Sequence, residues 1–166
     1  MSIADAVARA SAYLTEHPDE ARYRDSAATA RIDAGLVATV SGPGGESTST
    51  DMPAGIGGTA TTVSPGWLLR AAAASCVASL IVIRAAALGI TIGPVEVTVD
   101  SESDDRGILG LDESVPAGAL SMKVVVSIGD PSPADDARRD LVDWALAHCP
   151  VTETVSRAVP ISVELR

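Results

Sequence analysis

The stretch SPGWLLRAAAASCVASLIVIRAAALG, residues 64–89, is the clearest structural element of the sequence. The hydroxyl of Ser64 can cap a helix, and Pro65 suits the first helical position because its missing N–H has no partner there anyway. Gly89 can close the last turn. The sequence therefore predicts a helix over residues 65–88, and the rest of the fold has to be arranged around it.

This helix is apolar on nearly every side, so a membrane span has to be tested first. Only thirteen residues lie between Arg70 and Arg84, whereas a helix that crosses a bilayer needs roughly 20 apolar residues. The helix is therefore expected to be enclosed by protein on all sides, and a single small sheet can cover only one of them. We therefore expect further chain or a second subunit on the other side, and no membrane insertion.

Helices and strands alternate in mixed order on both sides of this segment. Proline, glycine and capping residues mark the helix ends, and alternation of apolar with polar residues indicates half-buried strands. Helices are expected over 2–15, 133–147 and from Pro150 onward, and strands over 28–40, 46–51, 95–100, 120–128 and 159–165. With no repeat and no linker, the pattern predicts one α+β domain over residues 1–166, including an N-terminal helix within residues 1–17.

Composition excludes several classes of function. The chain has 166 residues, is 46% hydrophobic, contains no Phe and carries a formal net charge of -10. Because like charges repel, we expect neither nucleic acid nor an anionic membrane surface as a partner. The N-terminal residues lack the basic start and apolar run of a signal peptide, so we expect a cytoplasmic protein with reduced thiols.

Motifs for metals and nucleotides are present only in fragments. The G-x-G-x-x-A match at residues 55–60 follows no apolar strand, and the acidic loop from Asp100 has Asp105 and Leu111 where a calcium loop needs Gly and Glu. His17, His148 and the two cysteines are scattered without a C-x-x-C spacing. We expect no metal and no cofactor, and we interpret His148 as a surface residue.

The two cysteines occupy different environments. Cys149 precedes Pro150 and is expected at the N-cap of a short helix, where free amides favour the thiolate; a small residue tolerated at a cap is the alternative. Cys76 lies in the middle of the apolar helix, where a thiol is ordinarily inert unless another segment brings a cation to it. Its helical neighbours at three and four residues are uncharged: Ala72, Ala73, Ser79 and Leu80.

The segments SPGWLLRAAAASCVASL and AHCPVTETVSRAVPISVEL together resemble the two cysteine motifs of the OsmC/Ohr family, the osmotically inducible and organic hydroperoxide resistance proteins. In that family a Ser/Asn-Pro loop leads into a long central helix with a Cys near its middle. A later Cys-Pro-Val/Ile-Ser/Thr stretch precedes the last strand. The resemblance covers residues 64–166, and the N-terminal helix is extra to it.

The resemblance implies an OsmC-like fold, in which an antiparallel sheet packs on the long buried helix of an intertwined homodimer. It also implies a cysteine-based peroxidase. Cys76 would attack an organic hydroperoxide and become a sulfenic acid. Cys149 would resolve that acid as a Cys76–Cys149 disulfide, and a dithiol reductant would restore both thiols.

One departure from the family pattern bears on this chemistry. Family peroxidases hold an Arg beside the reactive thiol with a Glu that follows the motif proline, and here that position is Gly66. Arg70 lies about 120° around the helix from Cys76 and is expected to face elsewhere, leaving Arg22, Arg24 or Arg31 as outside candidates. Without a cation, burial should hold the pKa of Cys76 at or above about 8.5. A non-catalytic member that binds a small apolar ligand in a dimer groove is the alternative function.

Overall fold

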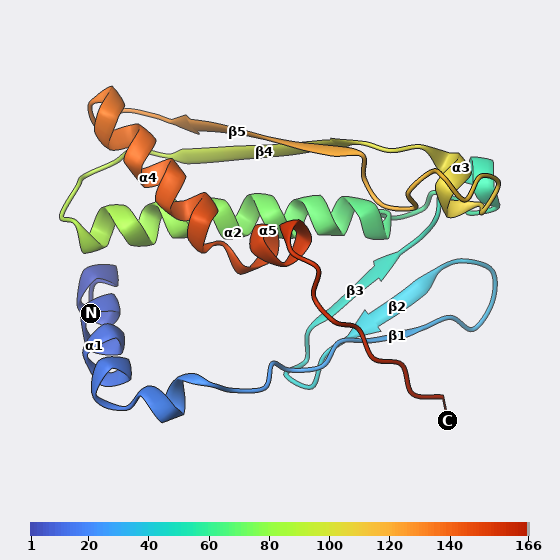
Figure 1. Ribbon diagram of the computed structural model, residues 1–166, viewed down its shortest axis with the longest axis horizontal. Helices are drawn as coiled ribbons and strands as arrows, with labels where there is room; N and C mark the ends of the chain where they lie inside the picture. The colour runs from blue at the N-terminus through green and yellow to red at the C-terminus, as the bar shows by residue number, and fades with distance from the viewer. Residues whose placement is uncertain (166) are drawn as a thin grey trace. The chain divides into compact units, whose positions relative to one another are not determined.

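The computed structural model describes residues 1–165, whose contacts divide the chain into two compact units. Unit 1 comprises residues 1–8 and the chain from Arg70 onward, and unit 2 comprises residues 9–69. Figure 1 shows the order of the elements along the chain. The single domain expected from the sequence stays a prediction, and each unit is described here by itself.

Unit 2 contains a three-stranded antiparallel sheet in the order β1-β2-β3. Its strands are β1 (Thr29–Arg31), β2 (Ala38–Ser41) and β3 (Ser47–Thr50). The prediction of one strand over 28–40 was wrong, because a turn containing Gly35 at φ 64° divides that segment into two paired strands. The expected return strand is confirmed, since β3 pairs with β2.

Three further elements lie in the first third of the chain: α1 (Ile3–Glu16) and the 3-10 turns η1 (Pro18–Ala21) and η2 (Ala54–Ile56). The N-terminal helix was expected, and its first turn is held by a reciprocal cap. Ser2 Oγ accepts from the Asp5 amide at 3.1 Å, while the Asp5 carboxylate accepts from the Ser2 amide at 3.0 Å.

The central helix α2 (Pro65–Ala87) ends within one residue of the predicted position. Ser64 Oγ accepts from the Trp67 amide at 3.2 Å, and Gly89 adopts φ 66° after the last turn. Figure 1 shows the antiparallel strands β4 (Val95–Glu102) and β5 (Ser121–Ile128) side by side along this helix. The chain between the strands carries α3 (Asp105–Ile108), and α4 (Asp135–His148) and α5 (Pro150–Ser156) follow.

The core of unit 1 forms on one stripe of α2. Side chains spaced four residues apart are buried, because residues at that spacing share one face of a helix. They are Ala73, Val77, Ile81 and Ala85. The other faces of α2 are more open, and Leu88, directly after its last residue, is 50% exposed. By length and composition alone α2 could cross a membrane, with a mean hydropathy of 1.8, but the core helix of a soluble protein passes the same test.

Two predictions in the C-terminal part were wrong. The fourth helix begins at Asp135 rather than at Pro133, because Ser132 Oγ bonds the Pro133 carbonyl instead of capping and Ala134 takes the N-cap position. Residues 159–165 form no strand. Three of their alternating apolar side chains stay in solvent, with Ile161, Val163 and Leu165 exposed by 90%, 82% and 92%, whereas Val159 is 40% exposed.

Candidate functional site: a thiol pair in the core of unit 1

The fold brings Cys76 and Cys149 together. Cys149 belongs to the buried core cluster with Val77 and Ile81, and Cys76 packs against that cluster from the middle of α2. The two thiols are free, and each acts on the ionisation of the other through a side-chain hydrogen bond. Two residues far apart in sequence therefore form one site between α2 and the α4–α5 junction.

The α4–α5 junction fixes the orientation of Cys149. This residue ends α4 and caps α5, with φ -77° and ψ 112°, and its side chain is fully buried. Its Sγ accepts a hydrogen bond from the Thr152 amide at 3.5 Å. Pro150 occupies the first helical position, so the N-cap position expected from the Cys-Pro pair is confirmed.

The hydroxyl of Thr152 lies in the same small space. Thr152 Oγ1 is 3.3 Å from the Cys149 carbonyl oxygen and 3.4 Å from the Leu146 carbonyl oxygen, and it can donate to either. It also acts on the Cys149 thiol as a side-chain hydrogen-bond partner. Because a hydroxyl rotates freely about its C–O bond, it can turn from a carbonyl to a thiolate when one forms.

The two thiols differ in their readiness to ionise. Burial raises the pKa of Cys76, and the side chain of Cys149 raises it further; the Val151 amide opposes this rise only in part. Burial also acts against ionisation of Cys149, but hydrogen bonds from the Thr152 hydroxyl and amide, from Cys76 and from Val151 lower its pKa overall. The hydrogen bonds thus lower the pKa of Cys149, while burial raises the pKa of Cys76, in the direction expected from the sequence.

No positive charge is among the groups that chiefly set the pKa of Cys76 in the described chain. Arg70 Nη1 donates to Ser101 Oγ on β4 at 3.2 Å, which confirms that Arg70 is directed elsewhere. Arg31 forms an ion pair with Asp33 at 2.6 Å within unit 2. Within unit 1, the groups that act on the two thiols are hydrogen-bond donors and the thiols themselves.

His148 precedes Cys149 but is directed away from the thiol. Its ring stacks on Trp144 at 4.2 Å between centroids, and Nδ1 donates to the Trp144 carbonyl at 2.7 Å. The Arg84 guanidinium lies 4.9 Å from the centroid of the Trp144 ring. The interpretation of His148 as a surface residue is confirmed, since its side chain is exposed.

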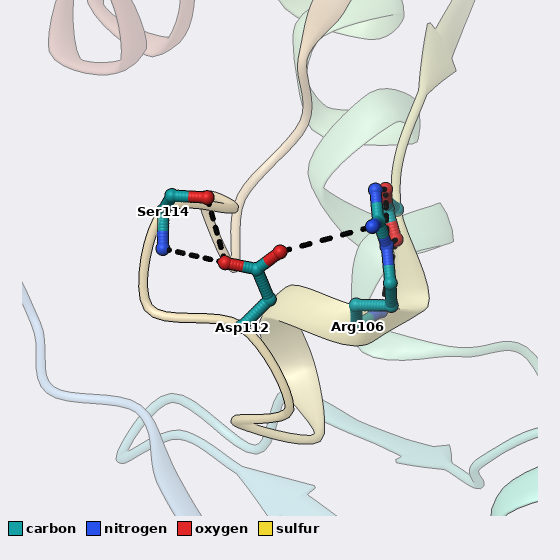
Figure 2. Close-up of polar contacts among 4 residues, drawn as sticks. Arg106, Asp112 and Ser114 are labelled. Atoms are coloured by element: carbon teal, nitrogen blue, oxygen red, sulfur yellow. Dashed lines mark hydrogen bonds and ion pairs between the residues drawn. The ribbon is translucent and has the colours of Figure 1, made fainter.

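The acidic loop after β4 is closed by one arginine (Figure 2). Arg106 donates to Asp104 and lies 3.8 Å from the Asp112 carboxylate, which also accepts from the Ser114 amide and hydroxyl. The side-chain hydrogen bond from Arg106 lowers the pKa of Asp104 to about 2. Across residues 1–165, no three His, Cys, Asp or Glu side chains are grouped to hold a metal ion.

Sequence reasoning missed a second polar centre, in unit 2. Asp51 is only 2% exposed, and its carboxylate accepts from the Met52 amide at 2.7 Å, the Thr59 amide at 2.9 Å and the Thr59 hydroxyl at 2.6 Å. Thr61 adds an amide at 3.2 Å. Every oxygen faces a donor of the same loop, so Asp51 has a structural role. The sequence signal that could have indicated this centre is an aspartate followed by a Gly-rich loop that ends in Thr59 and Thr61.

Comparison with known proteins places this arrangement in a family. The family model of the OsmC-like proteins matches residues 58–164, which contain both cysteines. An organic hydroperoxide resistance protein from Elizabethkingia anophelis is 19% identical with a TM-score of 0.66, over 82% of this chain and 91% of that one. No curated protein matches the sequence.

Two further solved structures share the fold. The organic hydroperoxide resistance protein OsmC from Legionella pneumophila has 19% identity and a TM-score of 0.61, over 81% of this chain and 90% of that one. OhrB of Bacillus subtilis, an organic hydroperoxide resistance protein, has 21% identity and a TM-score of 0.54, over 86% of this chain and 98% of that one. The fold, the family model and the position of both cysteines within it agree: this chain belongs to the OsmC-like protein family.

Proposed function

We propose that the protein is a thiol-dependent peroxidase that reduces organic hydroperoxides. The observation that carries this proposal is the contact between Cys76 and Cys149 in the core of unit 1. A peroxidatic and a resolving thiol need such a contact, because the sulfenic acid has to meet the second sulfur without a large rearrangement. Solved structures that share the fold are of organic hydroperoxide resistance proteins, which is consistent with this substrate class.

The chemistry proceeds in two steps. The Cys76 thiolate attacks the terminal peroxide oxygen; an S–O bond forms, the O–O bond breaks, and the leaving alkoxide takes a proton to become the alcohol. Cys149 then attacks the sulfenic sulfur, forming the Cys76–Cys149 disulfide and releasing water once the hydroxyl has taken a proton. A dithiol reductant returns two electrons and two protons, so that both thiols are restored.

The working form proposed here is a cytoplasmic homodimer. A second copy would cover the faces of α2 that one chain leaves open, including the part around Leu88. The thiols are reduced in this compartment, which the dithiol step requires. Neither nucleic acid nor a membrane has a part in this proposal, in keeping with the net charge of -10.

Peroxide consumption with several dithiols tests the proposal. The wild-type protein should consume cumene hydroperoxide with alcohol as product, and Cys76→Ser should abolish the consumption. Ser79→Ala, an exposed position one turn further along α2, serves as the matched control and should keep the activity. If no dithiol supports turnover and peroxide does not oxidise Cys76, the peroxidase is refuted and the non-catalytic alternative is favoured.

Substrate size is a second test of the same proposal. Leu80 lies on the Cys76 side of α2 among partly buried apolar residues that pack against the core cluster. Burial of an alkyl or aryl group there gains about 25 cal/mol per Å², and hydrogen peroxide offers no such area. We expect a higher kcat/KM for cumene hydroperoxide than for hydrogen peroxide; equal values would count against an apolar substrate site.

A further inference from the structure

The two thiols differ in their access to solvent. Cys149 is 0% exposed and lies inside the core cluster, together with Val77, Ile81 and Ala145. Cys76 is only partly buried and packs against that cluster from the middle of α2. A thiol from solution has to touch a sulfur before it can exchange with it, so access decides which sulfur of a disulfide is attacked. Of the two sulfurs, that of Cys76 is the open one.

Cys76 stands at the border between the buried and the open side of α2. Residues three and four apart are neighbours on a helix, so their burial defines its surroundings. On one side Ala73 is 1% exposed and Leu80 packs against the core cluster. On the other side Ala72 and Ser75 are exposed, and both side chains are small. A molecule in solution can therefore approach the Cys76 sulfur over Ala72 without moving the core.

We propose that external thiols meet this pair only at Cys76: the dithiol reductant attacks the Cys76 sulfur of the disulfide, and Cys149 is the leaving thiol. Cys149 then exchanges bonds with Cys76 alone and never bonds a molecule from solution. This inference rests on the proposed function, because it concerns the disulfide that the peroxidase reaction forms. It adds the direction of the reductive half of the cycle, and it places the approach of the reductant beside Ala72.

The electron and proton balance of this reduction closes with one dithiol. A reductant thiolate bonds the Cys76 sulfur while the Cys76–Cys149 bond breaks, and Cys149 leaves as a thiolate that takes up one proton. The second thiol of the reductant loses its proton and attacks the reductant sulfur of this mixed disulfide. Cys76 then leaves as a thiolate and takes up a proton, and the reductant closes its own disulfide. Two electrons and two protons have passed from the dithiol to the pair.

The position of the mixed disulfide tests the proposal on the wild-type protein without any peroxide. Diamide oxidises the pair, a pulse of 2-mercaptoethanol opens the disulfide, and N-ethylmaleimide then traps the freed thiol. Trypsin separates the two cysteines into peptides 71–84 and 140–157, which mass spectrometry distinguishes. We expect mercaptoethanol on Cys76 and maleimide on Cys149. The reverse distribution, or an even one, overturns the proposal.

Alkylation of the reduced protein measures the same difference in access. Iodoacetamide should label Cys76 at least about tenfold faster than Cys149 in the native protein, because a buried group reacts only through opening of the fold. The hydrogen bonds that lower the pKa of Cys149 favour the opposite order, so a preference for Cys76 reports access. In denaturing urea the two rates should converge. Equal rates in the native protein, whether both thiols are open or a second copy covers both, would overturn the proposal.

A side chain that obstructs the approach gives a third test. Ala72→Phe should slow mixed-disulfide formation with glutathione at least about tenfold, because its ring would stand beside the open side of the thiol. Ala87→Phe, the same substitution at an exposed position at the end of α2, should leave that rate unchanged. Unchanged rates in both variants would refute an approach beside Ala72. Equal slowing in both would refute it as well, since the effect would not be local.

Failure of the proposed function can be told apart from failure of this inference. If the wild-type protein consumes no cumene hydroperoxide but mercaptoethanol still bonds Cys76, the peroxidase proposal fails and the assignment of Cys76 stands. If peroxide is consumed while mercaptoethanol bonds Cys149, only the direction of the reduction is wrong. A protein in which diamide forms no Cys76–Cys149 bridge overturns both the resolving step and this inference.

Discussion

At the scale of single residues, the site depends on which polar groups surround each sulfur. Sequence alone placed Cys149 at a helix start, because a Cys-Pro pair before a helical stretch fits the N-cap and first helical positions. Thr152 could have been identified in the same way, since a donor three residues after the N-cap reaches the capping side chain. The contact between Cys76 and Cys149 could not be derived from sequence spacing. That contact was expected only from the resemblance to the OsmC/Ohr family, because the local sequence does not indicate which helices pack together.

Asp51 gives a prediction about acid stability. Its carboxylate is held by the Thr59 hydroxyl and by amides of the same loop, and these bonds lower its pKa from 3.8 to about 2 although burial opposes them. The folded pKa lies below the unfolded one, so the stabilisation is present above about pH 4 and is lost as the pH falls toward 2. Asp51→Asn should therefore lower the urea midpoint at pH 6. The difference in urea midpoint between Asp51→Asn and wild type should narrow as the pH falls from about 4 toward 2.

Asp25→Asn is the matched control for this measurement, because Asp25 is an exposed carboxylate of the same unit. Its urea midpoint should follow the wild-type curve at every pH. A difference between Asp51→Asn and wild type that stays constant from pH 6 to 2 would contradict a role for the charge of Asp51.

Gly58 in the same loop gives a packing prediction. A Cβ at this position would lie 1.7 Å from the Met52 carbonyl oxygen, a backbone atom that cannot move aside cheaply. Gly58→Ala should lower the free energy of unfolding by more than about 2 kcal/mol, at the upper end of ordinary point substitutions. Gly55→Ala meets no atom within 4 Å and should change it by less than about 0.5 kcal/mol. Similar urea midpoints for the two variants would refute the close approach.

At the scale of elements, α2 shows how far local sequence signals predict where a helix begins. Its start was predicted from a cap and a proline, and the same reasoning failed at Ser132, whose hydroxyl bonds a neighbouring carbonyl. A cap signal is local, so it indicates where a helix can begin without excluding a later start. Residues 159–165 show the corresponding limit for strands. Alternation of apolar and polar residues predicts which side chains of a strand share a face. A strand also needs a neighbouring strand for its backbone hydrogen bonds, and the alternation does not indicate which segment that is.

The buried stripe of α2 carries a prediction of its own. Ile81 is fully buried in the core cluster, so Ile81→Ala removes side-chain volume that its neighbours cannot fill. The free energy of unfolding should fall by about 2–5 kcal/mol in urea titrations monitored by circular dichroism. Leu88→Ala, on a side chain that is 50% exposed near the end of α2, should cost less than about 1 kcal/mol. Equal losses in the free energy of unfolding would contradict the difference in burial between Ile81 and Leu88.

At the scale of the whole molecule, the unburied apolar surface predicts a homodimer. A single chain buries one stripe of α2, and Ile161, Val163 and Leu165 remain almost fully in solvent. Exposed apolar area of this kind is typical of protein interfaces. We expect sedimentation velocity at micromolar concentration to give a dimer. A stable, well-folded monomer would contradict this expectation.

The C-terminal segment allows a sharper form of this prediction. Ile161 and Val163 are 90% and 82% exposed, and in an extended chain their side chains point to the same side while Ser162 points to the other. Ile161→Glu with Val163→Glu should therefore place two charges on the surface that a second copy covers and weaken the dimer at least about tenfold, because burial of unpaired charges is costly. Ser162→Glu adds one charge to the opposite side and should leave the dimer intact. If the double variant sediments as the wild type does, the segment lies outside the interface, and the open faces of α2 alone would have to hold the two subunits together.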